Sequence, residues 1–405
     1  DVALPGAVPL TVARSYSSQR HRDEGLLGKG GWVLSLEQWV TPDEGADGEV
    51  LALRLPDGRN AYFEPIGPGE RTFHRREQLE LHAEAGQHGA RYRVWDVRRR
   101  LWQRFEAQVA GGKARLVSIA DAHGSAITLE YDGDRLARVI DTAGRELRCV
   151  YDEAGRYLRR LEVWAALPTQ PGQAPAAPTL QTWVDYAQDS DECLAAATDA
   201  EGHAERYRYD VQRRMVQVTV KNGTSFYYAY EEQYGRCIKT WGDNGLHKVE
   251  LDRRPGNEVY TFGNPEPRHY VYTDDGYALV EETVGGDFRR EKTYDDDRYV
   301  LTESNAAGET YAFEYDERGH RTKVVDPAGN TAEWIFESDL PVQQVGRDGH
   351  ATTYAYDERG SLIAASYPTA ERYLIGYDAY GRVATISDAD GVRLSFGYDA
   401  HHNLV

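Results

Sequence analysis

The sequence contains few of the residues that usually fill irregular cores or bind metals. Among its 405 residues there are one Met, nine Phe and three cysteines, and Cys149, Cys193 and Cys237 form no Cys-x-x-Cys pair. Met is a common filler of irregular cores, and three isolated cysteines make neither a disulfide framework nor a zinc site. We therefore expect no metal, no cofactor, and a fold that can assemble in a reducing cytoplasm.

Long apolar segments are also missing. Because no run of about 18 apolar residues occurs, the sequence predicts no membrane contact from this segment. No secretory signal pattern is present at the N-terminus. Since the chain begins with Asp1 rather than Met, we expect it to be a piece of a longer protein.

The charge balance is strongly acidic, with a formal net charge of −19. Nucleic acids and anionic membranes are bound through basic patches, so the sequence predicts no nucleic-acid partner. The mean hydropathy of −0.67 indicates much surface relative to core. The 28 Tyr and eight Trp nevertheless supply enough apolar area for an ordered fold.

Tyrosine is abundant because it recurs at a fixed period. Tyr-Asp pairs are spaced by 20 or 21 residues in several places, and a fixed period of this length predicts a repeat architecture. Degenerate copies at Tyr186, Tyr230-Glu231, Leu251-Asp252, Tyr272-Thr273 and Phe336-Glu337 fill the gaps and give thirteen copies. The expected structural markers of the repeats are Tyr131, Asp132, Tyr151, Asp152, Tyr209, Asp210, Tyr294, Asp295, Tyr315, Asp316, Gly319, Tyr356, Asp357, Gly360, Tyr377, Asp378, Gly381, Tyr398 and Asp399.

Each copy contains two predicted turns. In the copy that starts at Tyr315, Asp316 to Gly319 and Asp326 to Gly329 both have Asp first and Gly fourth, which is the signature of a type I turn. Short alternating runs such as 310–315 lie between the turns and predict half-buried antiparallel strands. A copy is therefore a hairpin that leads into the next hairpin, and no long amphipathic helix interrupts the array.

The number of strands predicts the architecture. Thirteen hairpins give about 26 strands, which at ~4.8 Å spacing make a sheet about 125 Å wide. Such sheets coil or close because strands twist, and one closed turn would have a radius of about 20 Å, too wide for side chains to fill. We expect an all-β fold: a long antiparallel hairpin array that coils into a curved or cocoon-like shell with a central cavity.

The repeat, Tyr-Asp-x-x-Gly followed about ten residues later by Asp-x-x-Gly, resembles the repeat of the Rhs/YD-repeat family. The most regular copies are those at 315–330, 356–362, 377–392 and 398–405. The motifs Leu4-Pro5-Gly6, Arg14 to Ser18 and Gly25 to Trp32 are similar to the segment before the repeats in bacterial Rhs toxins. Insecticidal toxin-complex C components and teneurins are relatives of that family.

The resemblance implies a domain organisation and a function. It implies an N-terminal Rhs-type β region over 1–120 and a repeat array over 121–405, truncated at the C-terminus and carrying a Pro-rich loop insertion at 165–180. The chain would be a shell segment of a polymorphic toxin that encloses a C-terminal toxin domain for delivery in interbacterial competition. Its partners would be the remaining shell repeats and the toxin domain, with type VI spike or PAAR components and a chaperone. It would be made in the bacterial cytoplasm and then secreted or delivered to a target cell.

No motif in the sequence predicts catalysis. The acidic runs Asp295 to Asp297 and Asp189 to Glu192 lack the frame of a calcium loop, and the Gly28 to Gly31 loop lacks the Ser or Thr of a phosphate loop. We expect no catalytic, cofactor-binding or metal residues and no enzyme activity in this chain. The resemblance implies that a toxin enzyme and an autoproteolytic site lie elsewhere in the parent protein.

Two alternatives to a passive shell remain open. The tyrosine ladder could serve a carbohydrate-binding or adhesion module of a cell-surface repeat protein, because aromatic rings stack on ligands. An autoprocessing protease would instead cleave itself. We favour tyrosines that pack over the neighbouring repeat, because a ligand site would be local and the tyrosines recur in every copy. We also expect Val405 to lie at a sheet edge completed by further repeats or another chain.

Overall fold

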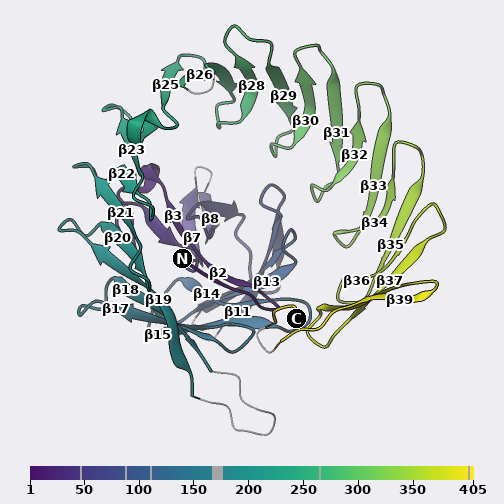
Figure 1. Cartoon of the computed structure of the whole chain (residues 1–405), viewed down its shortest axis with the longest axis horizontal. Helices are drawn as coiled ribbons and strands as arrows, with labels where there is room; N and C mark the ends of the chain where they lie inside the picture. The colour runs from purple at the N-terminus through teal and green to yellow at the C-terminus, as the bar shows by residue number, and fades with distance from the viewer. Residues whose placement is uncertain (46–47, 87–88, 110–111, 167–176, 264–265, 400–401) are drawn as a thin grey trace. The chain divides into compact units, whose positions relative to one another are not determined.

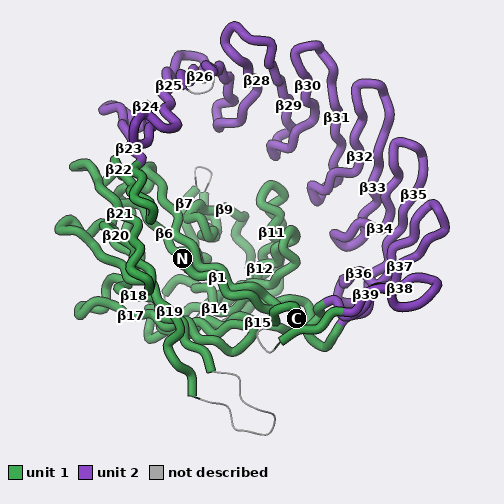
Figure 2. The backbone as a smooth tube through the Cα atoms, viewed as in Figure 1, with its two compact units in different colours: residues 1–225, 378–382, 396–405 green, residues 226–377, 383–395 purple. Residues whose placement is uncertain are grey.

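The computed structural model describes residues 1–45, 48–86, 89–109, 112–166, 177–263, 266–399 and 402–405. Apart from the helical turns η1 (Ser18–Arg20) and η2 (Asp243–Gly245), the regular elements of these residues are strands, which confirms the all-β prediction. Within these ranges, no helix has the length and apolar character that crossing a membrane requires. The chain divides into a first unit, residues 1–225, 378–382 and 396–405, and a second unit, residues 226–377 and 383–395 (Figure 2).

A 33-stranded sheet contains most of the strands. From β10 to β39 each strand lies beside the next one in sequence, and the strand pairs run antiparallel (Figure 1). The predicted antiparallel hairpin array is therefore confirmed. Consecutive hairpins are joined by tight turns, and this connection requires no crossover segment.

The first strands of the chain form short pairs outside the large sheet. Strand β1 pairs with β2, β3 with β6, and β4 with β5. Their bounds are β1 (Val2–Leu4), β2 (Leu10–Val12), β3 (Arg14–Tyr16), β4 (Glu24–Gly25), β5 (Gly28–Lys29) and β6 (Trp32–Leu34).

The next eight strands form the β7–β14 meander, whose strand pairing is interrupted between β9 and β10 and whose last strand pairs with its first. Ala114 and Arg115 of the last strand pair with Val40 and Trp39 of the first. Inward-facing residues such as Leu81 and Phe105 are fully buried, so this meander has its own core. Its strands are β7 (Trp39–Gly45), β8 (Gly48–Arg54), β9 (Asn60–Phe63), β10 (Arg71–His74), β11 (Leu79–Gly86), β12 (Gly89–Asp96), β13 (Leu101–Ala107) and β14 (Ala114–Ala120).

The repeat strands of the first unit follow directly. Strand β18 ends at Ala165 and its partner β19 begins at Thr179, and residues 167–176 of the predicted insertion at 165–180 lie outside the described residues. The strands are β15 (Ala126–Asp132), β16 (Arg135–Ile140), β17 (Glu146–Tyr151), β18 (Leu158–Ala165), β19 (Thr179–Gln188), β20 (Leu194–Asp199), β21 (Ala204–Tyr209) and β22 (Met215–Thr219).

The second unit is a single layer of hairpins that follow a curved path (Figure 1). Among its described residues, the buried apolar side chains are those of Ala364 and Ala365. Its strands are β23 (Ser225–Tyr230, whose first residue belongs to the first unit), β24 (Cys237–Gly242), β25 (Val249–Arg254), β26 (Glu258–Gly263), β27 (Arg268–Tyr272), β28 (Ala278–Thr283), β29 (Arg289–Tyr294), β30 (Val300–Asn305), β31 (Thr310–Tyr315), β32 (Arg321–Val325), β33 (Thr331–Glu337), β34 (Leu340–Val345), β35 (Ala351–Tyr356), β36 (Leu362–Ser366), β37 (Arg372–Tyr377), β38 (Val383–Asp388) and β39 (Gly391–Ser395).

Candidate functional site

The aspartate of each regular repeat organises a turn through its carboxylate. Asp316 Oδ1 accepts hydrogen bonds from the backbone N–H groups of Arg318 and His320, both at 2.9 Å. The backbone of Asp316 also binds both Gly319 and His320, which closes a three-residue loop. Gly319 has a φ of 81°, a conformation that glycine adopts without strain. Asp and Gly are therefore required by the same turn.

The tyrosine of the repeat ties its strand to the preceding repeat. Tyr315 Oη donates a hydrogen bond to the backbone carbonyl of Val300, 15 residues earlier, at 3.0 Å. The second strand of the repeat carries one extra residue opposite this tyrosine, and this bulge brings Arg321 directly opposite Tyr315. The same hydroxyl–carbonyl bond joins Tyr131 to Leu116, Tyr151 to Leu136, Tyr209 to Leu194, Tyr356 to Pro341 and Tyr377 to Leu362, and Tyr294 reaches Ala278, 16 residues earlier.

Burial keeps these hydroxyls in their donating form. It raises the pKa of the Tyr131 and Tyr151 phenols well above the ordinary value. A phenol that is buried and bound to a main-chain carbonyl serves the sheet and is not free to bind a ligand. This geometry explains why the tyrosines recur in every regular copy.

Most of the other marker aspartates bond as Asp316 does. Oδ1 accepts the main-chain N–H of the fourth following residue at Asp152, Asp210, Asp295, Asp357 and Asp378. Asp399 binds Asn403 in the same way, and Tyr398 forms a bridge with Leu404. Gly360 and Gly381 have φ values of 78° and 76°.

Asp132 departs from this pattern. It lies within β15 opposite Arg135, across a two-residue turn in which Gly133 has a φ of 62°. Its carboxylate makes an ion pair with Arg135 at 2.8 Å. The turn at Asp132 therefore differs from the predicted type I turn, because its glycine lies at the second place and not at the fourth.

Two degenerate copies are also placed differently from the prediction. The bulge and the turn lie at Gln188-Asp189, and Asp189 Oδ1 accepts the N–H of Cys193 at 2.9 Å, so Tyr186 stands two residues before the marker position. Leu251 and Asp252 lie inside β25 in regular pairing with β26 and form no turn. Both assignments filled gaps in the ladder of Tyr-Asp pairs, whereas main-chain hydrogen bonding decides where the turns lie.

The N-terminal strands β1 to β6 form a covering segment over the repeats of the first unit. Arg14 is the main polar anchor of this covering segment. Its guanidinium donates to Tyr207 Oη and Glu205 Oε2, each at 2.9 Å, and to Asp1 Oδ1 at 2.8 Å. The carbon of the guanidinium lies 5.8 Å from the Tyr186 ring centre and 5.7 Å from that of Tyr207. The Arg14 side chain is 8% exposed, so this charge is paired away from water.

Trp32 and the glycine loop before it make the second anchor. Trp32 Nε1 donates to Tyr209 Oη at 2.7 Å, and the Lys29 N–H donates to the Glu192 carbonyl at 2.8 Å. At Gly28, with a φ of 118°, a Cβ atom would collide with that same carbonyl. The glycine motif is therefore a close backbone contact between the covering segment and a repeat turn. The sequence signal was the glycine cluster, but its partner was not predictable.

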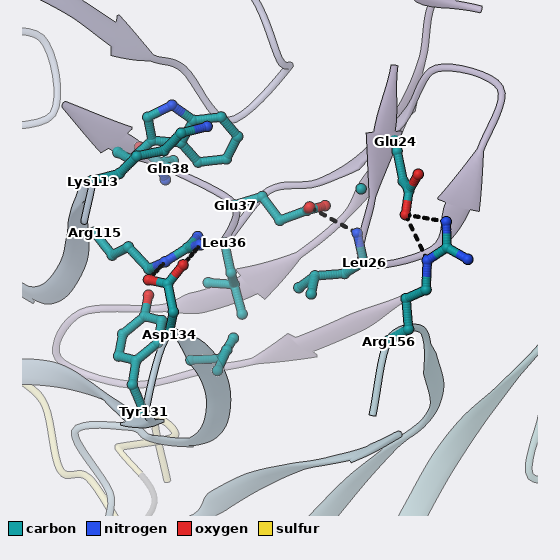
Figure 3. A pocket seen from close by; sticks show the side chains of 13 residues that line it. Glu24, Leu26, Leu36, Glu37, Gln38, Lys113, Arg115, Tyr131, Asp134 and Arg156 are labelled. Atoms are coloured by element: carbon teal, nitrogen blue, oxygen red, sulfur yellow. Dashed lines mark hydrogen bonds and ion pairs between the residues drawn. The ribbon is translucent and has the colours of Figure 1, made fainter. Parts of the chain in front are cut away.

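A pocket of about 250 Å³ lies in the first unit between this segment and the first repeat (Figure 3). Glu37 enters it and accepts the N–H groups of Leu26 at 2.9 Å and Leu34 at 2.6 Å. Loss of water around the carboxyl raises its pKa, although these hydrogen bonds oppose the shift. Arg115 pairs with Asp134 on the opposite wall. The Glu37 carboxylate thus binds main-chain N–H groups, and Arg115 and Asp134 bind each other.

Reactive chemistry is not supported by the remaining candidate groups. Burial raises the pKa of the Cys149 thiol to about 12 and that of Cys193 to about 11, so neither is a thiolate at neutral pH. Among the described residues, no group of three or more His, Cys, Asp or Glu side chains could hold a metal ion. The acidic runs at 189–192 and 295–297 lie in repeat turns closed by main-chain bonds.

Comparison with known families identifies the repeat. The family described as RHS Repeat matches residues 194–225, 294–331 and 377–405, and a domain of unknown function, DUF6531, matches residues 1–63. The chain therefore carries the RHS repeat over these three ranges. The matched ranges contain the tyrosine–carbonyl bonds of Tyr209, Tyr315 and Tyr377.

Two curated relatives from Dickeya dadantii (strain 3937) align with the whole of this chain. It is 25% identical over 440 residues to the protein named "Probable deoxyribonuclease RhsB" and 26% identical over 441 residues to "Probable deoxyribonuclease RhsA". The chain spans 27% and 28% of the lengths of these relatives.

Solved structures of toxin complexes are similar at low identity. A crystal structure of TcdB2-TccC3-Cdc42 matches with 12% identity and a TM-score of 0.48, covering 90% of this chain and 24% of that one. The Tc holotoxin pore of Photorhabdus luminescens matches with 12% identity and a TM-score of 0.49, covering 91% and 24%.

Proposed function

We propose that this chain is a shell segment of an Rhs-type polymorphic toxin, and that the shell encloses a C-terminal toxin domain for delivery in interbacterial competition. The observation that carries the proposal is the single-layer sheet of the second unit. One face of that sheet bears the repeated aromatic and aliphatic residues, and no described layer of the unit covers them. An apolar sheet face is stable in water only when another body covers it.

The proposal assigns distinct tasks to two regions. Residues 1–120 form the N-terminal Rhs-type region, whose first strands cover the apolar face of the earliest repeats. Residues 121–405 form the array that makes the wall. The separate core of the β7–β14 meander supports this division, because that region holds its own buried Leu81 and Phe105.

The proposed partners lie in the parent protein and in a delivery apparatus. They are the remaining shell repeats, the C-terminal toxin domain, type VI spike or PAAR components and a chaperone. Synthesis takes place in the bacterial cytoplasm, and secretion or delivery follows. Two relatives are named as deoxyribonucleases, and these names support a toxin enzyme elsewhere in such proteins.

We propose no enzyme activity for the chain itself. The tyrosines and aspartates that recur are used in main-chain hydrogen bonds, and the charged pocket residues pair with each other. The alternative of a carbohydrate module based on the tyrosine ladder is disfavoured, because the hydroxyls that a sugar would meet donate to carbonyls of the sheet.

A protease-protection experiment on the full-length parent protein tests the enclosure. The C-terminal domain should be digested much more slowly inside the full-length protein than as an isolated domain under the same protease. Opening the shell with a denaturant concentration that leaves the isolated domain folded should abolish the protection. Equal digestion rates for the enclosed and the isolated domain would overturn the proposal.

A further inference from the structure

Three hairpin turns meet at one end of the β7–β14 meander and line another pocket of the first unit. They are the turns 55–59, 75–78 and 97–100, which join β8 to β9, β10 to β11 and β12 to β13. Two of them are in direct contact, because the Val97 N–H donates to the Gln78 carbonyl at 3.1 Å. The pocket has a volume of about 340 Å³, which lies within the range of small-molecule sites in proteins.

One wall of this pocket carries an amide that the chain does not satisfy. Gln103 on β13 lines the pocket and is 6% exposed, and its side chain forms no hydrogen bond with the described residues. Two other buried glutamines at this end are bonded. Gln38 Nε2 donates to the Ser35 carbonyl at 2.9 Å, and Gln78 Nε2 donates to the Arg75 carbonyl at 3.0 Å. Because buried polar groups are nearly always hydrogen-bonded, the Gln103 amide indicates a partner from outside the chain, water or a ligand.

Positive charge is in excess at these turns, although the chain as a whole is acidic. The segments 55–60, 74–79 and 96–101 contain six arginines and three acidic residues. Such a local surplus attracts anions whatever the net charge of the chain, because salt screens interactions between charges that are more than about 10 Å apart. The turns therefore favour a negatively charged ligand.

The acidic side chains of the pocket are occupied by bonds within the chain. The Arg59 guanidinium donates to Asp57 Oδ2 and to Glu77 Oε1, each at 2.8 Å. Asp96 Oδ1 accepts the Arg99 N–H at 2.9 Å, and Asp96 Oδ2 lies 3.8 Å from Arg99 Nε. Since each carboxylate already has a cationic partner, these three residues do not repel an anion strongly.

Arg98 is a cation of the pocket with which no carboxylate of the described residues pairs. Its Nη2 donates to the Arg76 carbonyl at 3.0 Å, and the other N–H groups of the guanidinium remain available. Arg98 and Gln103 line the same pocket, beside the apolar side chains of Leu55 and Leu79. Guanidinium groups form strong, charge-assisted hydrogen bonds with carboxylates and phosphates. The pocket thus combines a free cation, a free amide and an apolar wall.

We propose that this pocket binds a small organic oxyanion, either a carboxylate or a phosphate ester. Arg98 pairs with the charge of the ligand, the Gln103 amide donates to one of its oxygens, and Leu55 and Leu79 contact its carbon atoms. The site goes beyond the proposed shell function and does not rest on it. The outcome of the protease-protection experiment and the outcome of the binding test are therefore independent of each other.

The probes are succinate and glycerol 3-phosphate, titrated separately into the chain in a calorimeter. At least one of them should bind saturably with one ligand per chain, and the tighter of the two identifies carboxylate or phosphate as the preferred group. Arg98→Gln should weaken this binding by about tenfold, and Gln103→Met by about fivefold. Absence of saturable binding for both probes overturns the proposal, as does equal binding of glucose, which carries no charge.

The Gln103→Met variant also separates binding from a structural role of the amide. Met has a similar size but no polar group at the end of its side chain. Because the Gln103 amide has no partner in the described chain, the melting temperature of the variant without ligand should be unchanged or higher. A lower melting temperature would mean that the amide serves the fold, and unchanged binding would mean that it does not touch the ligand. Either result overturns the site.

The matched control is Arg104→Gln. Arg104 neighbours Gln103 on β13, and successive residues of a strand point to opposite faces. Its side chain is 50% exposed and pairs with Glu106 at 3.4 Å. This change removes the same charge as Arg98→Gln but does not touch the pocket, so binding should be retained. A loss equal to that of Arg98→Gln would show that overall charge governs binding and would overturn the pocket as the site.

Discussion

The repeats on either side of Ser225 share turn and tyrosine chemistry but differ in what lies over their apolar face. In the first unit Val139, Leu147 and Leu161 are fully buried. In the described part of the second unit, alanines 364 and 365 are the apolar residues that reach burial. The tyrosine–carbonyl bonds are present in both units, so these hydrogen bonds form whether or not another segment covers the apolar face of the repeat. Cover adds hydrophobic stabilisation, at about 25 cal/mol for each Å² of apolar surface removed from water.

The largest effect should come from removing the polar anchor of the covered repeats. Arg14→Leu leaves the carboxylates of Asp1 and Glu205 without their cation. Because the side chains of Arg14 and Asp1 are only 7–8% exposed, the free energy of unfolding of the first unit should fall by about 3–5 kcal/mol. Hydrogen exchange followed by mass spectrometry should show faster exchange in β21 and unchanged exchange in β31 to β37.

The control for this change is Arg156→Leu. Arg156 pairs with Glu24 at the surface, and both side chains are more than 40% exposed, so the loss of stability should be much smaller than for Arg14→Leu. Comparable losses for Arg14→Leu and Arg156→Leu would show that the covering segment is not anchored at Arg14.

The second-largest effect should come from the hydroxyl of the marker tyrosine, which can be compared in a covered and in an uncovered repeat. Tyr209 Oη donates to the Leu194 carbonyl and accepts from Trp32 Nε1, whereas Tyr377 Oη donates to the Leu362 carbonyl. Tyr209→Phe should cost about 1–3 kcal/mol because it orphans two buried groups, and Tyr377→Phe about 1 kcal/mol. Thermal unfolding of the two variants measures the difference, and a larger shift for Tyr377→Phe would contradict it.

Acid should affect the two units differently, because folding lowers the pKa of the Glu281 carboxyl and raises that of Glu37. In the second unit, burial raises the pKa of Glu281, but hydrogen bonds from Arg290 and Arg268 outweigh it and hold the pKa below the usual value. The stability that this carboxylate contributes is fully present above the unfolded pKa of about 4.3 and is lost as pH falls through the folded pKa. Exchange in β28 should therefore accelerate below about pH 4, and Glu281→Gln should remove that dependence.

Glu37 should show the opposite sign in the first unit. Its folded pKa is raised, so its contribution is greatest below the unfolded pKa and diminishes as pH rises toward the folded value. Glu37→Gln should make the hydrogen-exchange protection of the Leu26 and Leu34 amides less dependent on pH. Exchange at these amides that accelerates below pH 4 in the same way as in β28 would contradict the contrast.

The smallest effect concerns turns in which another residue replaces glycine. Ala370 has a φ of 67° in the turn that Tyr367 closes, and Ala370→Gly should relieve about 1 kcal/mol of strain, partly offset by unfolded-state entropy. Gly349, with a φ of 75° and open space around it, is the reciprocal test: Gly349→Ala should destabilise by a similar amount. A stabilising Gly349→Ala would show that these turns can relax.

The repeat itself was predictable because its signals are local. The spacing of Tyr315, Tyr356 and Tyr377 and the Asp-x-x-Gly turns determine where strands end. The places where prediction was wrong are those where a local pattern continues without the hydrogen bond that defines the turn. Leu251-Asp252 has the period of the repeat but lies inside β25, and Tyr186 is displaced by two residues because strand alternation repeats every two residues.

The site residues were predictable only in part. The marker tyrosines follow from the period, but the acceptors of their hydroxyls lie 15 residues earlier and depend on a bulge that has no strong sequence signal. Arg14, Trp32 and Glu37 reach their partners across the fold, and Arg14 lies 193 residues from Tyr207 in sequence. No periodicity predicts such a pair.

The sequence alone determined the all-β repeat, its period and its turns, because backbone conformation at Asp and Gly and the alternation of apolar residues act over a few residues. Tertiary structure decided which repeats are covered, what the glycine motif at Gly28 touches, and which tyrosine rings contact the Arg14 guanidinium. Those contacts form between segments that are far apart in the chain. The hydrogen bonds within a single layer of hairpins are the same whether or not such a segment packs on it.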